Sequence, residues 1–307
     1  MVLDDNRWGG AASYPIAIQD VELLDSAEAD PSVVVAVIDT GVVPLDGELA
    51  EHLVGDVEAN VDQLPTDGQG LGEFDGHGTF VASRVLAMAP RASLLMLNTL
   101  DESVGGSDEK VAAAIEGLRD MPEVRVANLS FFGLTEQVQT ESPAIGNALA
   151  KLIEHNEDIV IVTAAGNHGT SDPVWPAAYS RRYEQVLAIG AVDESVTNFG
   201  ADRIPPIAVF SAFGPYVSAF ASGVQVAGYR CVYRELTPPL RWVAQNFTGM
   251  CRWSGTSFAA AAVTGLITQQ ILEGHTGAEA REIVLRASKK MVTDISGYSC
   301  PYIETGR

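Results

Sequence analysis

Four polar residues stand where their side chains are well placed to do chemistry. Asp39 ends an apolar run, His77 lies between two glycines, and Ser257 opens a segment rich in small residues. Asn167 follows another apolar run that ends in Ala-Ala-Gly. An imidazole with small neighbours suits proton transfer, a hydroxyl at a helix start lies at the positive end of the dipole, and a side-chain amide can hold an oxyanion. These residue types indicate a candidate catalytic site.

Each of these residues taken alone also has a structural explanation. Asp-Thr-Gly at 39–41 after a strand fits an aspartic peptidase or a simple turn. The hydroxyl residues at 256–257 fit a helix cap, and Asn167 fits a turn. The histidines without glycine neighbours are expected to be structural or solvated: His52, His155 and His275. Only the four residues taken together therefore indicate a catalytic site.

The elements that would position these residues alternate between strands and helices. Apolar runs typical of buried parallel strands lie at 33–38, 93–97, 124–127, 159–162 and 186–189. Helix-like segments lie between several of them, at 79–88, 107–119 and 142–155. This order predicts an α/β fold, a three-layer sandwich with a mainly parallel central sheet flanked by helices. In such sheets the ligand site lies beyond the carboxyl ends of the strands.

Composition limits the partners of the chain. Of its 307 residues, 47% are hydrophobic and 7% aromatic, which suits a large buried sheet. The 19 basic and 40 acidic residues give a net charge of −21, which disfavours nucleic acid and anionic membranes and favours basic polypeptides. No apolar run approaches the roughly 20 residues of a membrane span. We expect a monomer that acts on polypeptide, with no nucleic acid and no membrane as partner.

Four motifs in chain order resemble the signature blocks of the subtilase family of serine peptidases. They are Asp-Thr-Gly at 39–41, Gly-His-Gly-Thr at 76–79, Ala-Ala-Gly-Asn at 164–167 and Gly-Thr-Ser-Phe-Ala at 255–259. The resemblance implies a subtilisin-like fold and a serine endopeptidase, for which two roles stay open, a general degrader and a dedicated processing peptidase. It also implies a catalytic triad of Asp39, His77 and Ser257.

The resemblance implies a role for each residue. Ser257 would attack the peptide carbonyl, His77 would act as base and then acid, and Asp39 would fix the imidazole tautomer. Asn167 would stabilise the oxyanion together with the Ser257 backbone N–H. The segment 126–133 resembles the family strand that pairs with substrate. The residues expected to line the substrate cleft are Ser130, Phe131, Phe132, Ala164, Ala165, Gly166, His168 and Asp172.

Two outcomes are open for the P1 residue, whose carbonyl is attacked. An inward Asp172 favours Arg or Lys, and the net charge of −21 reinforces that preference. An outward Asp172 leaves His168 and small apolar walls around a pocket for Leu, Phe or Met. The missing side chain of Gly166 is expected to leave room for substrate. Trp-Pro-Ala at 175–177 resembles a family turn whose peptide bond is often cis, so we expect a cis bond there.

Some features depart from the family pattern. The helix after the nucleophile reads Phe-Ala-Ala-Ala-Ala-Val at 258–263, where the family usually has Met-Ala-Ser-Pro-His-Val. Because Pro and His there are structural in the family, we expect different packing under the site. Phe80 and Ser83 likewise stand where the family usually has His and Gly. The loop that interrupts the helix after the histidine in calcium-binding relatives is missing. Glu48 alone would be a poor calcium site, so no cofactor is expected to be required, and only a weak calcium site remains as an alternative.

The chain is interpreted as a single peptidase domain over 1–307, with an elaborated loop or hairpin at 224–253 and no pro-domain. Its start lacks the pattern of a signal peptide, which favours the cytoplasm, with a secreted mature form as the alternative. Cys231 and Cys251 are candidates for pairing across the hairpin. The rival function is a catalytically silent subtilase fold that binds peptides, which requires a broken triad or a blocked cleft.

Overall fold

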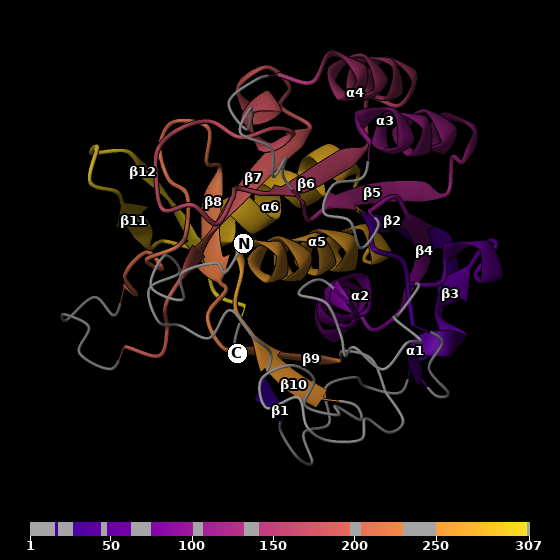
Figure 1. Cartoon of the computed structure of the whole chain (residues 1–307), viewed down its shortest axis with the longest axis horizontal. Helices are drawn as coiled ribbons and strands as arrows, with labels where there is room; N and C mark the ends of the chain where they lie inside the picture. Colours follow the sequence, from indigo (N-terminus) through magenta and orange to yellow (C-terminus); the bar gives the residue numbers. More distant parts are fainter. Residues whose placement is uncertain are drawn as a thin grey trace, which may run out of the picture.

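The fold is built around a nine-stranded sheet (Figure 1). The computed structural model describes residues 16–17, 27–43, 48–62, 75–100, 107–131, 141–196, 204–229 and 250–305. Neighbouring strands are parallel except β11 and β12. In sheet order the strands are β11 (Met291–Thr293), β12 (Ser299–Ile303), β8 (Ala219–Ser222), β7 (Val186–Val192), β6 (Val160–Ala164), β5 (Val124–Leu129), β2 (Asp30–Asp39), β4 (Ala92–Asn98) and β3 (Leu53–Val54).

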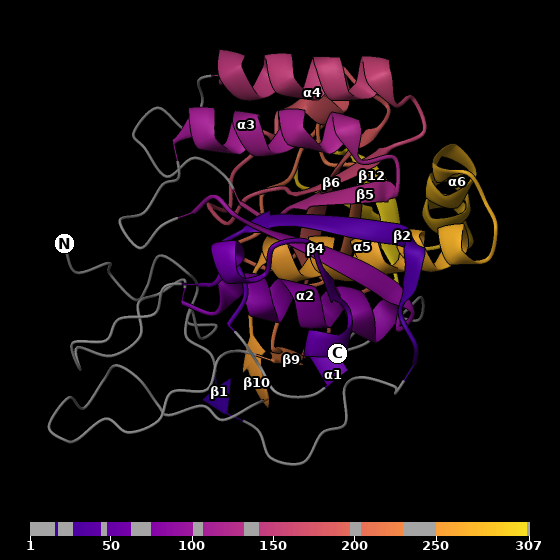
Figure 2. The ribbon, with the colours of Figure 1, turned by 90° about the vertical axis from the view of Figure 1, so that its right-hand side faces the viewer.

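Helices cover both faces of the sheet (Figure 2). The helices are α1 (Glu48–Glu51), α2 (His77–Met88), α3 (Asp108–Gly117), α4 (Pro143–His155), α5 (Thr256–Leu272) and α6 (Gly277–Ala287). Figure 2 shows α3 and α4 side by side on one face, with α2 and α5 on the other. Short 3₁₀ turns lie at Glu58–Asn60, Leu118–Asp120 and Ala177–Arg181. The three-layer α/β arrangement predicted from the sequence is therefore confirmed.

The central strand β2 is buried on both faces, which explains its continuous apolar sequence. Val35 and Val37 join the core formed with α2 and α5. Val34, Ala36 and Ile38 join the core formed with α3 and α4. Successive side chains of a strand point to opposite faces, so a strand between two helical layers has no polar side.

The order of the strands reverses at β2. The chain passes from β2 through α2 to β4 on one side, and later returns through α3 to β5 on the other side of β2. In α/β sheets, a ligand site forms at the carboxyl ends of the strands where the strand order reverses in this way. Asp39, at the end of β2, lies at this switch point.

A second, three-stranded sheet is formed by β1 (Ile16–Ala17), β10 (Met250–Trp253) and β9 (Val226–Tyr229). Strands β9 and β10 pair antiparallel and form the base of the hairpin predicted at 224–253. Cys251 is buried on β10, whereas Cys231 lies outside the described residues. Within the described ranges, no helix is long and apolar enough to cross a membrane.

Candidate active site

Asp39 and His77 are joined by a hydrogen bond at the carboxyl edge of the sheet. Asp39 Oδ1 lies 2.7 Å from His77 Nδ1 and also accepts the Thr40 backbone N–H at 2.8 Å. Both side chains are buried, Asp39 completely and His77 at 6% exposure. Because a carboxylate can only accept, the proton between them belongs to Nδ1, which leaves Nε2 as the basic nitrogen.

Two glycines let the start of α2 approach the end of β2. A Cβ on Gly78 would lie 2.1 Å from the Gly41 carbonyl oxygen. Gly41 has a φ of +93°, and a Cβ there would lie 2.4 Å from the Asn60 carbonyl oxygen. A side chain at either position would require the backbone to move. Gly78 is thus explained by the close approach of α2 to residue 41, and Gly41 by its positive φ and its contact with Asn60.

Aromatic rings surround the imidazole of His77. Its ring centroid lies 5.7 Å from that of Trp253 and 5.4 Å from that of Phe258. Phe80 packs on the same two rings, with centroids 5.6 Å from Trp253 and 4.4 Å from Phe258. It also fills the space beside Gly228 of β9, where a Cβ would lie 2.6 Å from the Phe80 ring. His77, Phe80, Trp253 and Phe258 therefore form one aromatic cluster under the site.

Ser83 links α2 to β9 at the same place. Its hydroxyl donates to the Phe80 carbonyl at 2.7 Å and accepts the Tyr229 backbone N–H at 2.9 Å. Phe80 and Ser83, which both differ from the usual family residues, thus contribute to the same contact between α2 and β9.

Ser257 is the second residue of α5 and is 5% exposed. Its hydroxyl donates to the Ser130 carbonyl at 3.0 Å. In return, Ser130 Oγ lies 3.0 Å from the Ser257 carbonyl oxygen and 2.7 Å from Asn128 Oδ1. Asn128 Nδ2 in turn donates to Thr264 on α5 at 2.8 Å. The loop after β5 and the first turns of α5 are therefore held together around Ser257.

The amide of Asn167 has a defined orientation. Its Oδ1 accepts the Thr256 backbone N–H at 2.9 Å and the Thr256 hydroxyl at 2.8 Å. A backbone N–H can only donate, so the atom facing it must be the oxygen. Asn167 Nδ2 consequently remains as a donor beside the start of α5, next to Ser257.

The structure brings the four motif residues to one place. Phe258, whose ring contacts the imidazole of His77, is the chain neighbour of Ser257. The arrangement holds a hydroxyl, an imidazole oriented by a carboxylate, and an amide donor at a helix N-terminus. These are the groups of base-assisted nucleophilic attack on a carbonyl.

The space beside Gly166 differs from the expectation. Gly166 has a φ of +113°, and a Cβ there would lie 2.8 Å from His168 Cε1 and 3.1 Å from Val174 Cγ2. The room predicted for substrate on that side is therefore occupied by the protein's own side chains. Ala164 and Ala165 are completely buried, and Phe132 lies outside the described residues.

Asp172 lies on an exposed loop. Its carboxylate accepts the Thr170 hydroxyl at 3.2 Å, and its backbone carbonyl oxygen lies 3.3 Å from His168 Nε2. The loop is anchored by Tyr216, whose hydroxyl donates to the Ala165 carbonyl at 3.0 Å. The Asp172 carboxylate therefore forms its hydrogen bond with Thr170 on the exposed loop.

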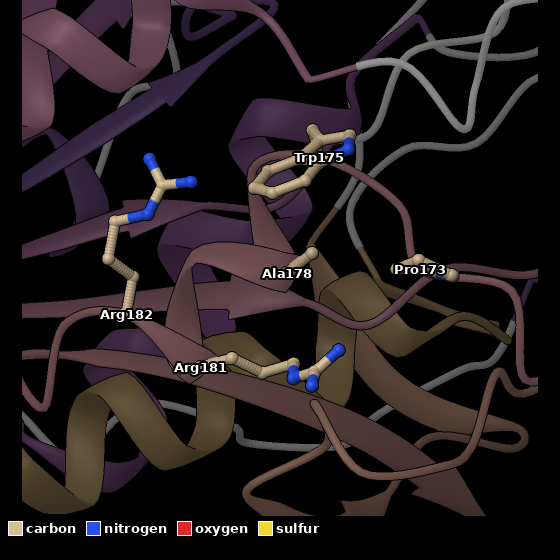
Figure 3. A pocket seen from close by; sticks show the side chains of 5 residues that line it. All are labelled: Pro173, Trp175, Ala178, Arg181 and Arg182. Atoms are coloured by element: carbon tan, nitrogen blue, oxygen red, sulfur yellow. The ribbon is translucent and has the colours of Figure 1, made fainter.

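The Trp175–Pro176 peptide bond is cis, as predicted. Next to it, a pocket of about 340 Å³ is lined by Pro173, Trp175, Ala178, Arg181 and Arg182 (Figure 3). The Arg182 guanidinium is paired with Glu141 at 2.7 Å. None of the lining residues belongs to the predicted triad or oxyanion site.

Across the described parts of the chain, no group of three or more His, Cys, Asp or Glu side chains could hold a metal ion. Helix α2 runs uninterrupted from His77 to Met88, and β4 begins at Ala92. Glu48 is the first residue of α1.

Sequence reasoning missed the residues that orient the site. Thr256 and Asn128 lie inside recognised motifs, but their roles depend on partners far along the chain. Asp62 lies in no motif, although its carboxylate accepts the Gly76 backbone N–H at 2.8 Å, directly before His77. No local signal marks Asp62, because its partners meet it only in the folded chain.

The chain is similar in sequence to known serine proteinases. The thermophilic serine proteinase of Bacillus sp. (strain AK1) is 30% identical over 271 residues, which are 84% of this chain and 56% of that protein. Subtilase-type proteinase RRT12 of Saccharomyces cerevisiae (strain ATCC 204508 / S288c) is 28% identical over 250 residues, 78% of this chain and 43% of that protein. The chain spans about half the length of these two relatives.

A solved structure has the same fold. The crystal structure of a cold-adapted subtilisin-like serine proteinase matches with a TM-score of 0.64 and 22% identity, over 98% of both chains. The family model described as the subtilase family matches residues 30–298, which include all four motifs. The chain belongs to the subtilase family.

Proposed function

We propose that the chain is a serine endopeptidase that hydrolyses peptide bonds through an acyl-enzyme on Ser257. The observation that carries this proposal is the 2.7 Å bond between Asp39 and His77, with the imidazole packed beside the first turn of α5. Polypeptide is the proposed substrate, in keeping with the family.

In the proposed mechanism, His77 Nε2 takes the proton of the Ser257 hydroxyl as its oxygen attacks the peptide carbonyl. In the present structure the hydroxyl donates to Ser130, and rotation about the Cα–Cβ bond redirects it to the imidazole. The proton then passes from His77 to the leaving amine. In the second half of the reaction, His77 takes a proton from water as the water attacks the acyl-enzyme. His77 returns that proton to the Ser257 oxygen as the acid product leaves. Asp39 holds the tautomer and stabilises the imidazolium.

The oxyanion of the tetrahedral intermediate is proposed to lie between Asn167 Nδ2 and the Ser257 backbone N–H. Thr256 holds the amide oxygen through two hydrogen bonds, so the donor is oriented before substrate arrives. The N-terminus of α5 adds a positive dipole end at the same point.

Ser257 is expected to be covalently modified by a fluorophosphonate, because a base-activated hydroxyl reacts where ordinary serines do not. Mass spectrometry of the labelled, folded protein should place the adduct on Ser257, and heat-denatured protein should remain unlabelled. Folded protein that fails to react would contradict the peptidase proposal and favour the silent peptide-binding module.

We expect the enzyme to accept small P1 side chains better than aromatic ones, because His168 and Val174 fill the space beside Gly166. In a P1 substrate library, His168→Gly should raise kcat/KM for Phe and Leu by about 10-fold or more. Room for one additional methylene group in an apolar pocket changes kcat/KM by about that factor. The matched variant Asp172→Asn should leave the profile unchanged. Strong Arg or Lys cleavage that collapses in Asp172→Asn would contradict this assignment.

A further inference from the structure

One oxygen of Asp62 receives two hydrogen bonds at the base of the site. Asp62 Oδ2 accepts the Gly76 backbone N–H at 2.8 Å and the Thr40 hydroxyl at 3.0 Å. The residue is only 7% exposed, and its own backbone N–H donates to the Val42 carbonyl at 2.9 Å. A buried carboxylate held in this way has a fixed position and a fixed set of partners.

Thr40 extends these bonds to both members of the Asp39–His77 pair. Its hydroxyl oxygen accepts the Gly78 backbone N–H at 3.1 Å, and its backbone N–H donates to Asp39 Oδ1 at 2.8 Å. The peptide N–H groups on both sides of His77 are therefore held by one unit, Gly76 by Asp62 and Gly78 by Thr40.

We propose that Asp62 is a positioning residue of the catalytic pair, which fixes the backbone of His77 through Gly76 and Thr40 and places a negative charge one hydrogen-bonded residue, Thr40, away from Asp39. This role rests on the proposed peptidase function, since positioning matters only where His77 transfers protons. Asp62 touches neither substrate nor the reacting atoms, and acts through Thr40 and His77.

The surroundings of Asp62 make its charge sensitive to pH. Burial, together with the carboxylates Asp75 and Asp39, raises the pKa of Asp62 to about 6, against the lowering effect of its bonds to Gly76 and Thr40. Among the described residues, the charged groups that act on Asp62 are thus Asp39 at the end of β2 and Asp75 before α2, with His77 on α2 reached through Asp39. Asp62 is charged above about pH 6 and becomes neutral as the pH falls through that value.

Two substitutions separate the bonds from the charge. Asp62→Ala removes both and should lower kcat by about 10- to 100-fold with little change in KM, because the imidazole is no longer held in place. Asp62→Asn keeps an acceptor oxygen of the same shape and should restore most of kcat. Removing the negative charge disfavours the imidazolium, so the acidic limb of the kcat/KM profile of Asp62→Asn should move to lower pH.

The matched control is Asp56→Asn, which changes the net charge equally at an exposed position. It should leave kcat and the pH profile as in the native enzyme. Thermal melts of all variants identify any loss of folding, and if Asp62→Ala fails to fold, the pH profile of Asp62→Asn still tests the proposal. An Asp62→Asn profile that coincides with that of Asp56→Asn would overturn it.

A readout without catalysis separates this proposal from the proposed function. In Ser257→Ala protein, the NMR titration of the His77 Cε1–H signal reports the imidazole directly. Its midpoint should lie at lower pH when Asp62→Asn is added, and an unmoved midpoint would overturn the assigned charge effect. A moved midpoint, together with native protein that neither cleaves peptides nor reacts with fluorophosphonate, would support the coupling of Asp62 to His77 while contradicting the peptidase function.

Discussion

Replacing Ser257 by alanine is expected to lower kcat by about 10⁶-fold, the scale known for loss of the nucleophile in subtilisin itself. The other groups of the site stay in place, but without the hydroxyl no acyl-enzyme forms. The measurement is initial-rate hydrolysis of a peptide substrate by purified variant, with the residual rate compared with the uncatalysed reaction. The oxyanion donors and substrate binding should leave a residual acceleration of about 10³–10⁴ over water.

Ser254→Ala provides the matched control for this experiment. Ser254 lies three residues earlier, between β10 and α5, and its hydroxyl accepts the Gln225 backbone N–H at 3.0 Å. The control should retain near-native kcat with a modest loss of stability, on the order of 1 kcal/mol for one hydrogen bond. Equal activity in Ser257→Ala and Ser254→Ala would show that Ser257 is not the nucleophile.

Asn167→Ala is expected to lower kcat by about 10²–10³-fold while KM changes little; the oxyanion-hole donor of subtilisin sets this scale. The donor Nδ2 interacts with charge that exists only after attack, so its loss is felt in the transition state and not in substrate binding. Steady-state kinetics with kcat and KM resolved separately provides the measurement.

Thr256→Val gives a graded comparison. This nearly isosteric change removes the hydroxyl that lies 2.8 Å from Asn167 Oδ1 but keeps the backbone N–H bond at 2.9 Å. Its loss in kcat should fall between the native enzyme and Asn167→Ala, because the amide remains but is less firmly oriented. If Asn167→Ala instead raised KM and left kcat intact, Asn167 would belong to substrate binding and not to the oxyanion hole.

The sequence predicts the central elements well because burial on both faces leaves a continuous signal. The run 33–38 became β2, and the other four predicted runs became β4, β5, β6 and β7. The strand at Ala219–Ser222 was missed, since four small or mixed residues have no periodicity of their own. Its pairing with β7 and β12 is decided by the surrounding sheet.

The catalytic residues could be predicted because each stands in a short motif with glycine. Residues whose role depends only on contacts in the folded chain were missed. His77 and Ser257 are flanked by residues that no ordinary helix start needs. Asp62 has no such flank, since its partners are 14 and 22 positions away and its function depends on their meeting. The sequence also did not predict that side chains fill the space beside Gly166, because it does not determine the rotamer of His168.

The aromatic cluster around His77 makes the side chains at positions 80, 83 and 258 energetically interdependent. A return to the family's His at position 80 alone would insert a polar ring between Trp253 and Phe258, where the Phe80 ring now packs at 5.6 and 4.4 Å. A return to Gly at position 83 alone would leave the Tyr229 N–H without its acceptor. Each single reversion therefore destabilises, and neighbouring changes of this kind are not additive. The effects of substitutions at positions 80, 83 and 258 on the free energy of unfolding are therefore expected to depend on one another.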